Sequence, residues 1–155
     1  MGDRNNIIIY QPTYGSEEPP QPLYLYSHWH GQELNKVVVE AITIGGDRVG
    51  DPTYFTRILF NTMTAEDYSV EKLDNGGHRL QTGKTGFGIG VNGGVDQDMY
   101  NIPIEIHWDT KSLNPRGFVD FVPYIKYYEM TYSFDQFVEA VENGNLPKHE
   151  ALADL

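Results

Sequence analysis

The sequence predicts an α+β fold in which a mostly antiparallel sheet of about five strands packs against about three helices. Three observations predict this class: strand-like segments gather in clusters, helix-like segments gather in others, and glycine or proline separates them. A chain of 155 residues suits one domain with one core, and no internal repeat is visible. We therefore expect one α+β domain over residues 1–146 and a C-terminal tail over 147–155.

Two strands open the chain. Residues 6–11 (NIIIYQ) join three isoleucines to a tyrosine, which is typical of a buried or edge strand. Residues 15–22 (GSEEPPQP) form a loop, because their prolines cannot donate the hydrogen bonds of a central strand. Residues 23–28 alternate in polarity and predict a second strand. We expect these two strands to pair as a hairpin with a long loop.

Two helices follow, and a third lies near the C-terminus. The first ends at the glycine pair 45–46. The second begins at residues 51–52, an N-cap acceptor followed by proline. The third begins with a capping box over residues 133–136. The expected buried faces are Leu34, Val37, Val38, Ala41 and Ile42 in the first helix, Phe55, Ile58, Leu59 and Met63 in the second, and Phe134, Phe137, Val138 and Val141 in the third.

The middle of the chain is polar and rich in glycine. Residues 65–82 carry a short strand or turn around residues 75–77, and half of the 16 glycines lie between Gly76 and Gly94. Over residues 86–91 glycine alternates with Phe, Ile and Val, so one face of this strand lacks side chains. We expect a neighbouring backbone, an aromatic ring or a ligand to pack closely against that face.

Two more strands complete the predicted sheet. They lie at residues 102–108 and 124–130, and a turn region over residues 109–117 separates them. Alternation within the first of these strands places its isoleucines and tryptophan on one face, with Glu105 and His107 on the other.

Composition excludes several classes of protein. The chain has no cysteine, which excludes disulfides, cysteine-bound metals and a cysteine nucleophile. Its net charge of −11 would repel a nucleic-acid backbone. No run approaches the roughly 20 apolar residues of a membrane span, and the first apolar run is too short for a signal peptide. We expect a cytoplasmic protein that binds neither membranes nor nucleic acid directly.

Two histidines flank Trp29 in the segment YLYSHWHG. In a strand, His28 and His30 would share one face and could hold zinc, with His107 or Asp109 as further ligands. His30 lies where the strand turns into the first helix, so that shared face is lost. We therefore predict no metal site and no cofactor, and interpret His28 either as a hydrogen-bonding residue that joins segments or as one wall of a pocket.

Other catalytic patterns are incomplete. Residues 83–88 (GKTGFG) resemble the end of a P-loop, but His78 replaces the upstream glycine and a glycine-alternating strand follows instead of a helix. No serine lies in the nucleophile pattern G-x-S-x-G. The residues themselves therefore do not predict an enzyme.

Five segments keep an order that is familiar from one protein family. They are GDR at residues 2–4, YLYSHW at 24–29, the Asp-Pro start of the second helix at 51–60, GKTGFGI at 83–89 and SFDQFV at 133–138. With them the chain resembles a family of small uncharacterised bacteriophage and bacterial proteins, marked by GDR, Y-L-Y-S/T-H-W-G-G and E-T-G-F/Y-G-I. His30 replaces the family's glycine and Lys84 its glutamate. These departures argue against a shared two-histidine metal site and a shared catalytic carboxylate.

The positions that carry the resemblance are unusually polar. They form either one pocket or a buried network that fastens the N-terminus to the sheet. The pocket interpretation predicts a small phage-type accessory protein that binds a nucleotide-like ligand or a host protein and counters a host defence. Aromatic rings would stack on a base, and cations would meet phosphate. The expected ligand-binding residues are Arg4, Tyr24, Tyr26, His28, Trp29, Tyr54, Arg57, Lys84 and Thr85.

Two other functions stay open, together with the oligomeric state. An acidic protein can mimic nucleic acid and inhibit an enzyme that binds it. A small nucleotide hydrolase would use His28 with Asp3 or Asp109. The sequence leaves open whether the chain forms a homo-oligomer.

Overall fold

The computed structural model describes residues 2–12, 19, 21–65, 69–81, 86–91, 96–113 and 119–147. Its strands are β1 (Asn5–Tyr10), β2 (Leu23–Ser27), β3 (Ser69–Lys72), β4 (His78–Gln81), β5 (Phe87–Val91), β6 (Ile104–Leu113), β7 (Val119–Tyr127) and β8 (Met130–Ser133). Its α-helices are α1 (Leu34–Gly45), α2 (Pro52–Met63) and α3 (Phe134–Glu142), with short 3₁₀ turns at Gly31–Glu33 and Gly46–Gly50. The predicted α+β class is confirmed.

Six strands form the main sheet, in the order β5-β2-β1-β6-β7-β8. The predicted β1–β2 hairpin is confirmed, and its register places Ile7 opposite Leu25. All neighbouring strands are antiparallel except β1 and β6, which are parallel and place Ile7 beside Ile104. The sheet therefore has one strand more than predicted and is mixed, although antiparallel pairs dominate.

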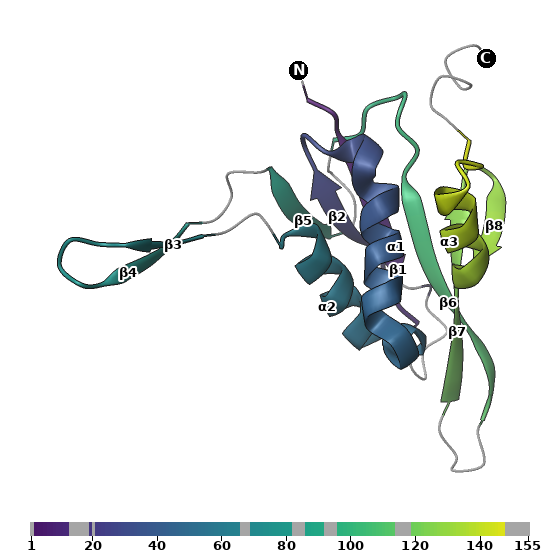
Figure 1. The fold of residues 1–155 in the computed structure, drawn as a ribbon. Coiled ribbons are helices and arrows are strands. Elements are labelled where there is room, and N and C mark those ends of the chain that lie inside the picture. The colour runs from purple at the N-terminus through teal and green to yellow at the C-terminus, as the bar shows by residue number, and fades with distance from the viewer. Residues whose placement is uncertain are drawn as a thin grey trace.

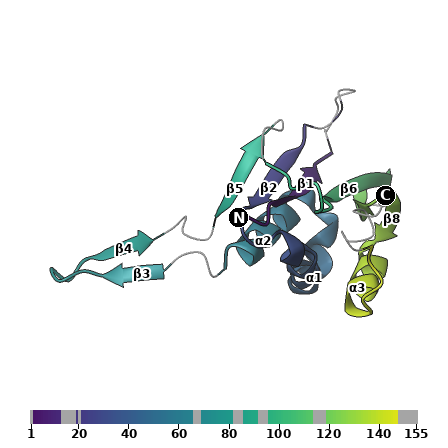
Figure 2. The same ribbon diagram turned by 90° about the horizontal axis from the view of Figure 1, so that it is seen from above.

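The helices α1, α2 and α3 all lie on one face of this sheet (Figures 1 and 2). The isoleucines of the central strands pack against the apolar faces of the helices, and Trp108 Nε1 donates to the Val49 carbonyl at 2.9 Å. The opposite face, called the open face, carries no helix of the described residues. The side chains on it include Ile8, Tyr10, Tyr24, Tyr26, Glu105, His107, Tyr124 and Lys126, which follow from alternation and register.

Local signals in the sequence set the helix ends. Asp51 accepts a hydrogen bond from the Tyr54 backbone N–H at 3.3 Å, and Pro52 begins α2. Ser133 and Gln136 form the predicted capping box of α3. Gly46 follows α1 with φ 51°, which suits a glycine.

Two predictions at the C-terminal half are wrong. The expected turn over residues 109–117 contains the end of β6, which continues to Leu113. The expected strand over residues 124–130 contains a turn at Tyr128 and Glu129, whose φ angles are 45° and 61°. Hairpin turns with positive φ usually carry glycine or asparagine, so this turn has no sequence signal.

The strands β3 and β4 form a separate two-stranded sheet. This hairpin over residues 69–81, called the arm, projects from the body beside β5 (Figures 1 and 2). It corresponds to the short strand or turn predicted around residues 75–77. The predicted tail lies outside the described residues from position 148 onward. In the described part of the chain, no helix combines the length and the apolar character that a membrane crossing requires.

Candidate functional site

The N-terminal segment is fastened to residues 96–101. Arg4 donates to Asp98 Oδ1 from Nη2 at 2.8 Å and from Nε at 3.1 Å, and its backbone N–H donates to Asp98 Oδ2 at 2.8 Å. The hydrogen bond from the Arg4 backbone, together with its guanidinium, holds the pKa of Asp98 below its ordinary value. Asp3 accepts from Asn101 Nδ2 at 2.7 Å and from the Gln32 backbone at 3.1 Å. Arg4 is therefore paired with a carboxylate within the fold, and the Asp3 carboxylate accepts hydrogen bonds from neutral donors.

His28 joins three segments where β2 ends. Its backbone N–H donates to the Gly86 carbonyl at 3.0 Å, and its carbonyl accepts from the Asp3 N–H at 2.7 Å. Its ring Nδ1 lies 2.7 Å from the Tyr26 hydroxyl, and the ring packs edgewise on Trp29 at 4.3 Å between centroids. The backbone of His28 therefore joins the end of β2 to Asp3 and Gly86, while its ring bonds Tyr26 of the same strand.

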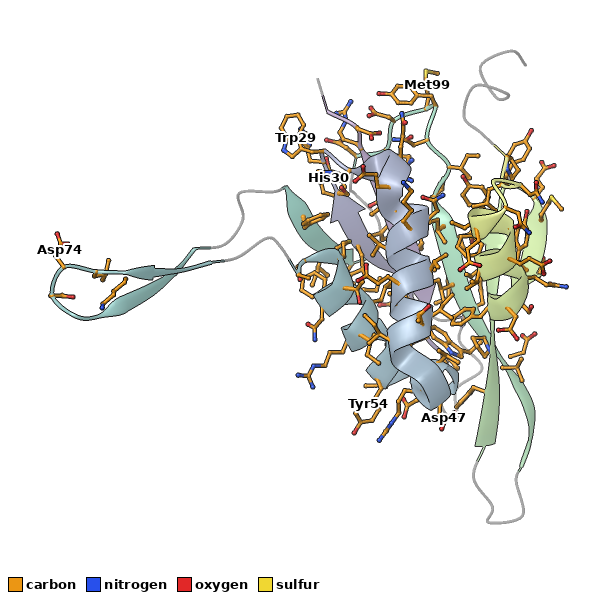
Figure 3. The ribbon with its side chains drawn as sticks, in the orientation of Figure 1. Trp29, His30, Asp47, Tyr54, Asp74 and Met99 are labelled. Atoms are coloured by element: carbon orange, nitrogen blue, oxygen red, sulfur yellow. The ribbon has the colours of Figure 1, made fainter. Side chains whose placement is uncertain are left out.

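The predicted ligand-binding residues do not share one surface. Arg4, Tyr26, His28 and Trp29 gather at the end of β2, and Tyr24 lies two residues earlier on the same face. Tyr54 and Arg57 are exposed on α2, and Figure 3 shows Tyr54 and Trp29 at opposite ends of the helical layer. Tyr54 also packs under the Arg48 guanidinium, 4.6 Å from its ring centroid.

The glycine-rich segment is only partly described. Lys84 and Thr85, which belong to the predicted site, lie outside the described residues. Gly86 has φ 76°, and a Cβ there would lie 2.8 Å from both His28 Cβ and Trp29 Cδ1. The close packing predicted for this segment therefore occurs at Gly86. On β5 itself, the aromatic rings of Tyr24 and Tyr26 lie opposite Gly90 and Gly88.

Two cavities lie in the helical layer. One, of about 330 Å³, lies between α1 and α3 and is lined by amides such as Asn5 and Asn101 and by apolar side chains. The other, of about 350 Å³, lies between α1 and α2 beside Phe87. Among the predicted ligand-binding residues that the structure describes, none lines either cavity. The described lining of the first cavity contains no Lys or Arg that could offer a counter-charge for a phosphate.

The open face carries a ladder of three parallel rings. Tyr10 stacks on His107 with 4.4 Å between ring centroids and 7° between planes. His107 stacks in turn on Tyr124 at 5.0 Å and 12°. The rings come from β1, β6 and β7, whose register places Tyr10 beside His107 and His107 beside Tyr124. The ladder therefore covers both faces of the imidazole and one face of each tyrosine.

Electrostatics keep the ladder neutral. Burial lowers the pKa of His107 below its ordinary value of 6.5, although Glu105, whose Oε1 lies 3.3 Å from His107 Nε2, opposes this shift. Burial also raises the pKa values of Tyr10 and Tyr124 above their ordinary value of 10.0. The ladder is thus an uncharged, partly buried aromatic strip at neutral pH.

The two ends of the ladder differ in their surroundings. Beyond Tyr10 lies β2, which carries Tyr24 on the same face. Beyond Tyr124 lies β8, where the paired residue is Ser133, and its small side chain caps α3. A flat ring placed above Ser133 would contact the outer face of Tyr124. Within the described residues, no group of three or more His, Asp or Glu side chains is placed to hold a metal ion.

Sequence reasoning did not assign Tyr10 or Tyr124 to a site. Both lie in segments predicted as strands, and Glu105 and His107 were correctly placed together on one strand face. The missing information was the pairing of strands, since the ladder forms only when β1, β6 and β7 lie side by side. The signal available was a single ring in each strand, Tyr10, His107 or Tyr124, next to a buried isoleucine of the other face.

No family model, curated protein or solved structure matches this chain. The resemblance of its five segments to bacteriophage and bacterial proteins therefore stays a prediction.

Proposed function

We propose that this chain is a binding module for a planar, singly phosphorylated ligand of the nucleotide class, held on the open face at the Tyr124 end of the ring ladder. The observation that carries the proposal is the stack of Tyr10, His107 and Tyr124, which ends beside the small residue Ser133. A nucleobase above Ser133 would extend this stack by one ring. Stacking of a base on an aromatic side chain contributes about 1–3 kcal/mol.

A cation lies next to this position. Lys126 is exposed and follows Tyr124 on the same face of β7, where its partner on β8 is Thr131. Two residues along a strand span about 7 Å, so a base on Tyr124 can place an attached phosphate near the Lys126 ammonium and the Thr131 hydroxyl. Arg4 is a weaker candidate for phosphate, because Asp98 already binds its guanidinium.

The local charges limit how much phosphate the site accepts. Glu105 lies opposite Lys126 across β6 and β7, and Asp109 is two residues beyond His107 on β6. These carboxylates repel further negative charge. A monophosphate therefore fits this surface better than a triphosphate.

The biological role follows as part of the same proposal. A module without catalytic groups would act by holding its ligand, which agrees with the expected role of an accessory protein that counters a host defence. The support for a bacteriophage origin and for this role is the resemblance of the five sequence segments. The support for the ligand class is the ladder with its neighbouring lysine.

Calorimetric titration with AMP, adenosine and ATP tests the proposal. We expect AMP to bind more tightly than either of the others, since adenosine lacks the phosphate and ATP meets Glu105. Tyr124→Ala should weaken AMP binding by about 5- to 150-fold, which corresponds to the loss of one stacked ring. Lys126→Ala should reduce the affinity for AMP to that for adenosine.

Matched variants separate this surface from the residues predicted from sequence. Tyr54→Ala removes an exposed tyrosine from α2 and should leave the affinity unchanged. Tyr124→Phe keeps the ring and should also bind AMP. Equal affinities for Tyr124→Ala and the wild type, or no binding of AMP, would refute the proposal. Conversion of AMP to adenosine during the titration would instead identify the hydrolase.

A further inference from the structure

The cavity of about 330 Å³ between α1 and α3, called the α1–α3 cavity, has no part in the proposed function. It lies on the helical side of the sheet, where α1 and α3 flank β6 (Figure 1). Its volume is within the range of about 300–1,000 Å³ that is typical of small-molecule sites. Its described lining contains no Asp, Glu, Lys, Arg or His, although the chain has a net charge of −11. An ion would lose its hydration there without gaining a counter-charge, so the lining favours an uncharged molecule.

Two buried amide side chains form a fixed polar part of this lining. Asn5 and Asn101 are 4% and 7% exposed. Asn5 Nδ2 donates to two backbone carbonyls at 3.1 Å and 3.0 Å. Asn101 Nδ2 donates to Asp3 Oδ1 at 2.7 Å and to the Arg4 carbonyl at 3.0 Å. These hydrogen bonds fix both amides before any ligand arrives, which lowers the entropy that binding costs.

Two amide atoms of this lining are available to a ligand. Asn101 Oδ1 accepts no hydrogen bond from the described residues. In the described part of the chain, only Asn6 Oδ1 is both unbonded and sealed from solvent, so Asn101 Oδ1 is accessible. Asn35 also lines the cavity, and its Oδ1 accepts from the Lys36 backbone N–H at 3.0 Å, whereas its Nδ2 has no partner among the described residues. The cavity therefore offers a free acceptor and a free donor, both uncharged.

Much of the remaining described lining is apolar. Ile102 and Ile104 lie at the start of β6, and Val141 lies on α3. Ala140 of α3 and Gly144, just after the helix, are small and fill little of the space between the helices. An apolar cavity with a few fixed polar groups is the usual form of a small-molecule site.

We propose that the α1–α3 cavity binds a neutral molecule in which a carboxamide or lactam group is attached to a small apolar body. The N–H of such a group donates to Asn101 Oδ1, and its carbonyl accepts from Asn35 Nδ2. The apolar body packs against Ile102 and Val141. This site uses the helical side of the sheet, so it is independent of the AMP site proposed on the open face.

Three isosteric probes test the charge of the ligand. Benzamide, benzoate and benzamidine have one shape and size, but they are neutral, anionic and cationic at neutral pH. In titrations of isotope-labelled protein followed by NMR, benzamide should shift the backbone amide resonances of Gly31, Asn101 and Gly144 in a saturable way. Benzoate and benzamidine should bind there about tenfold more weakly or less. Equal affinity for all three probes, or no saturable shift with benzamide, would overturn the proposal.

Substitutions in the lining place the probe inside the cavity. Ala140→Leu fills space beside α3 and should weaken benzamide binding about tenfold or more. Asn35→Leu keeps the size of the side chain but removes the donor, and should weaken binding by about 2- to 10-fold. Ala65→Leu is the matched control, because it makes the same change at an exposed residue outside this cavity, and it should leave the affinity unchanged.

The dispersion of the NMR spectrum checks that each variant is folded. Wild-type affinity for benzamide in folded Ala140→Leu would contradict binding inside the cavity. Should Ala140→Leu not fold, Asn35→Leu decides alone, since an exposed helix position tolerates leucine. Wild-type affinity in Asn35→Leu would then refute the proposed amide recognition.

Discussion

Replacement of Gly86 by alanine probes the joint between β5 and the His28–Trp29 pair. The backbone at Gly86 has φ 76°, a left-handed conformation that costs an alanine about 1–2 kcal/mol. The new Cβ would lie 2.8 Å from His28 Cβ and 2.8 Å from Trp29 Cδ1, well inside the contact distance of about 3.5–4.0 Å between carbon atoms. Overpacking of this kind costs about 1–3 kcal/mol. We therefore expect Gly86→Ala to lower the free energy of unfolding by about 2–5 kcal/mol.

Gly88→Ala is the matched control, two residues further along the same segment. Its Cβ would lie 3.9 Å from Tyr26 Cδ2, an ordinary contact, and its backbone does not require positive φ. This variant should be as stable as the wild type or gain up to about 1 kcal/mol from the reduced entropy of the unfolded chain. Urea unfolding followed by circular dichroism measures both. Equal stability of Gly86→Ala and Gly88→Ala would refute the packing described at His28.

Three further outcomes follow from the charges and caps. The free energy of unfolding should fall as the pH drops below 6.5, because the imidazole of His107 is protonated in the unfolded chain before it is in the folded chain. In urea titrations, His107→Phe should reduce the dependence of the unfolding free energy on pH in this range. Asp98→Asn should lower the urea midpoint at pH 7, and its difference from the wild type should shrink below pH 3.8, since the lowered pKa of Asp98 stabilises the fold only while the carboxylate is ionised. Ser133→Ala should cost about 1 kcal/mol in the same assay through loss of the α3 cap, whereas Ser133→Asp should restore most of it.

Sequence reasoning succeeded where the signal is local. Caps at Asp51 and Ser133 and the alternation of the first two strands depend on neighbouring residues, and the structure confirms them. Sequence reasoning failed at a turn whose backbone conformation has no typical residue to mark it. The turn at Tyr128 and Glu129 uses positive φ without glycine or asparagine, so the chain was expected to run straight through it.

The ring ladder depends on pairing between strands that are far apart in the sequence, so the sequence predicts it only in part. Parallel pairing of β1 with β6 brings Tyr10 beside His107, although neither segment indicates the other as its partner. Arg4 and His28 belong to the predicted site because they are polar and lie in the segments that carry the family resemblance. In the structure the Arg4 side chain bonds Asp98, whereas His28 bonds Asp3 and Gly86 through its backbone and Tyr26 through its ring.

Nuclear magnetic resonance of the tyrosine rings during titration with AMP tests the proposed site most directly. If the nucleobase extends the ladder, the ring resonances of Tyr124 should shift upfield with the adenine protons, while those of Tyr54 stay unchanged. The upfield shifts of the adenine protons should disappear in Tyr124→Ala and persist in Lys126→Ala with weaker affinity. Saturating AMP that leaves the Tyr124 ring resonances in place, or that shifts only residues around Asn5 and Asn101, would contradict binding on the open face.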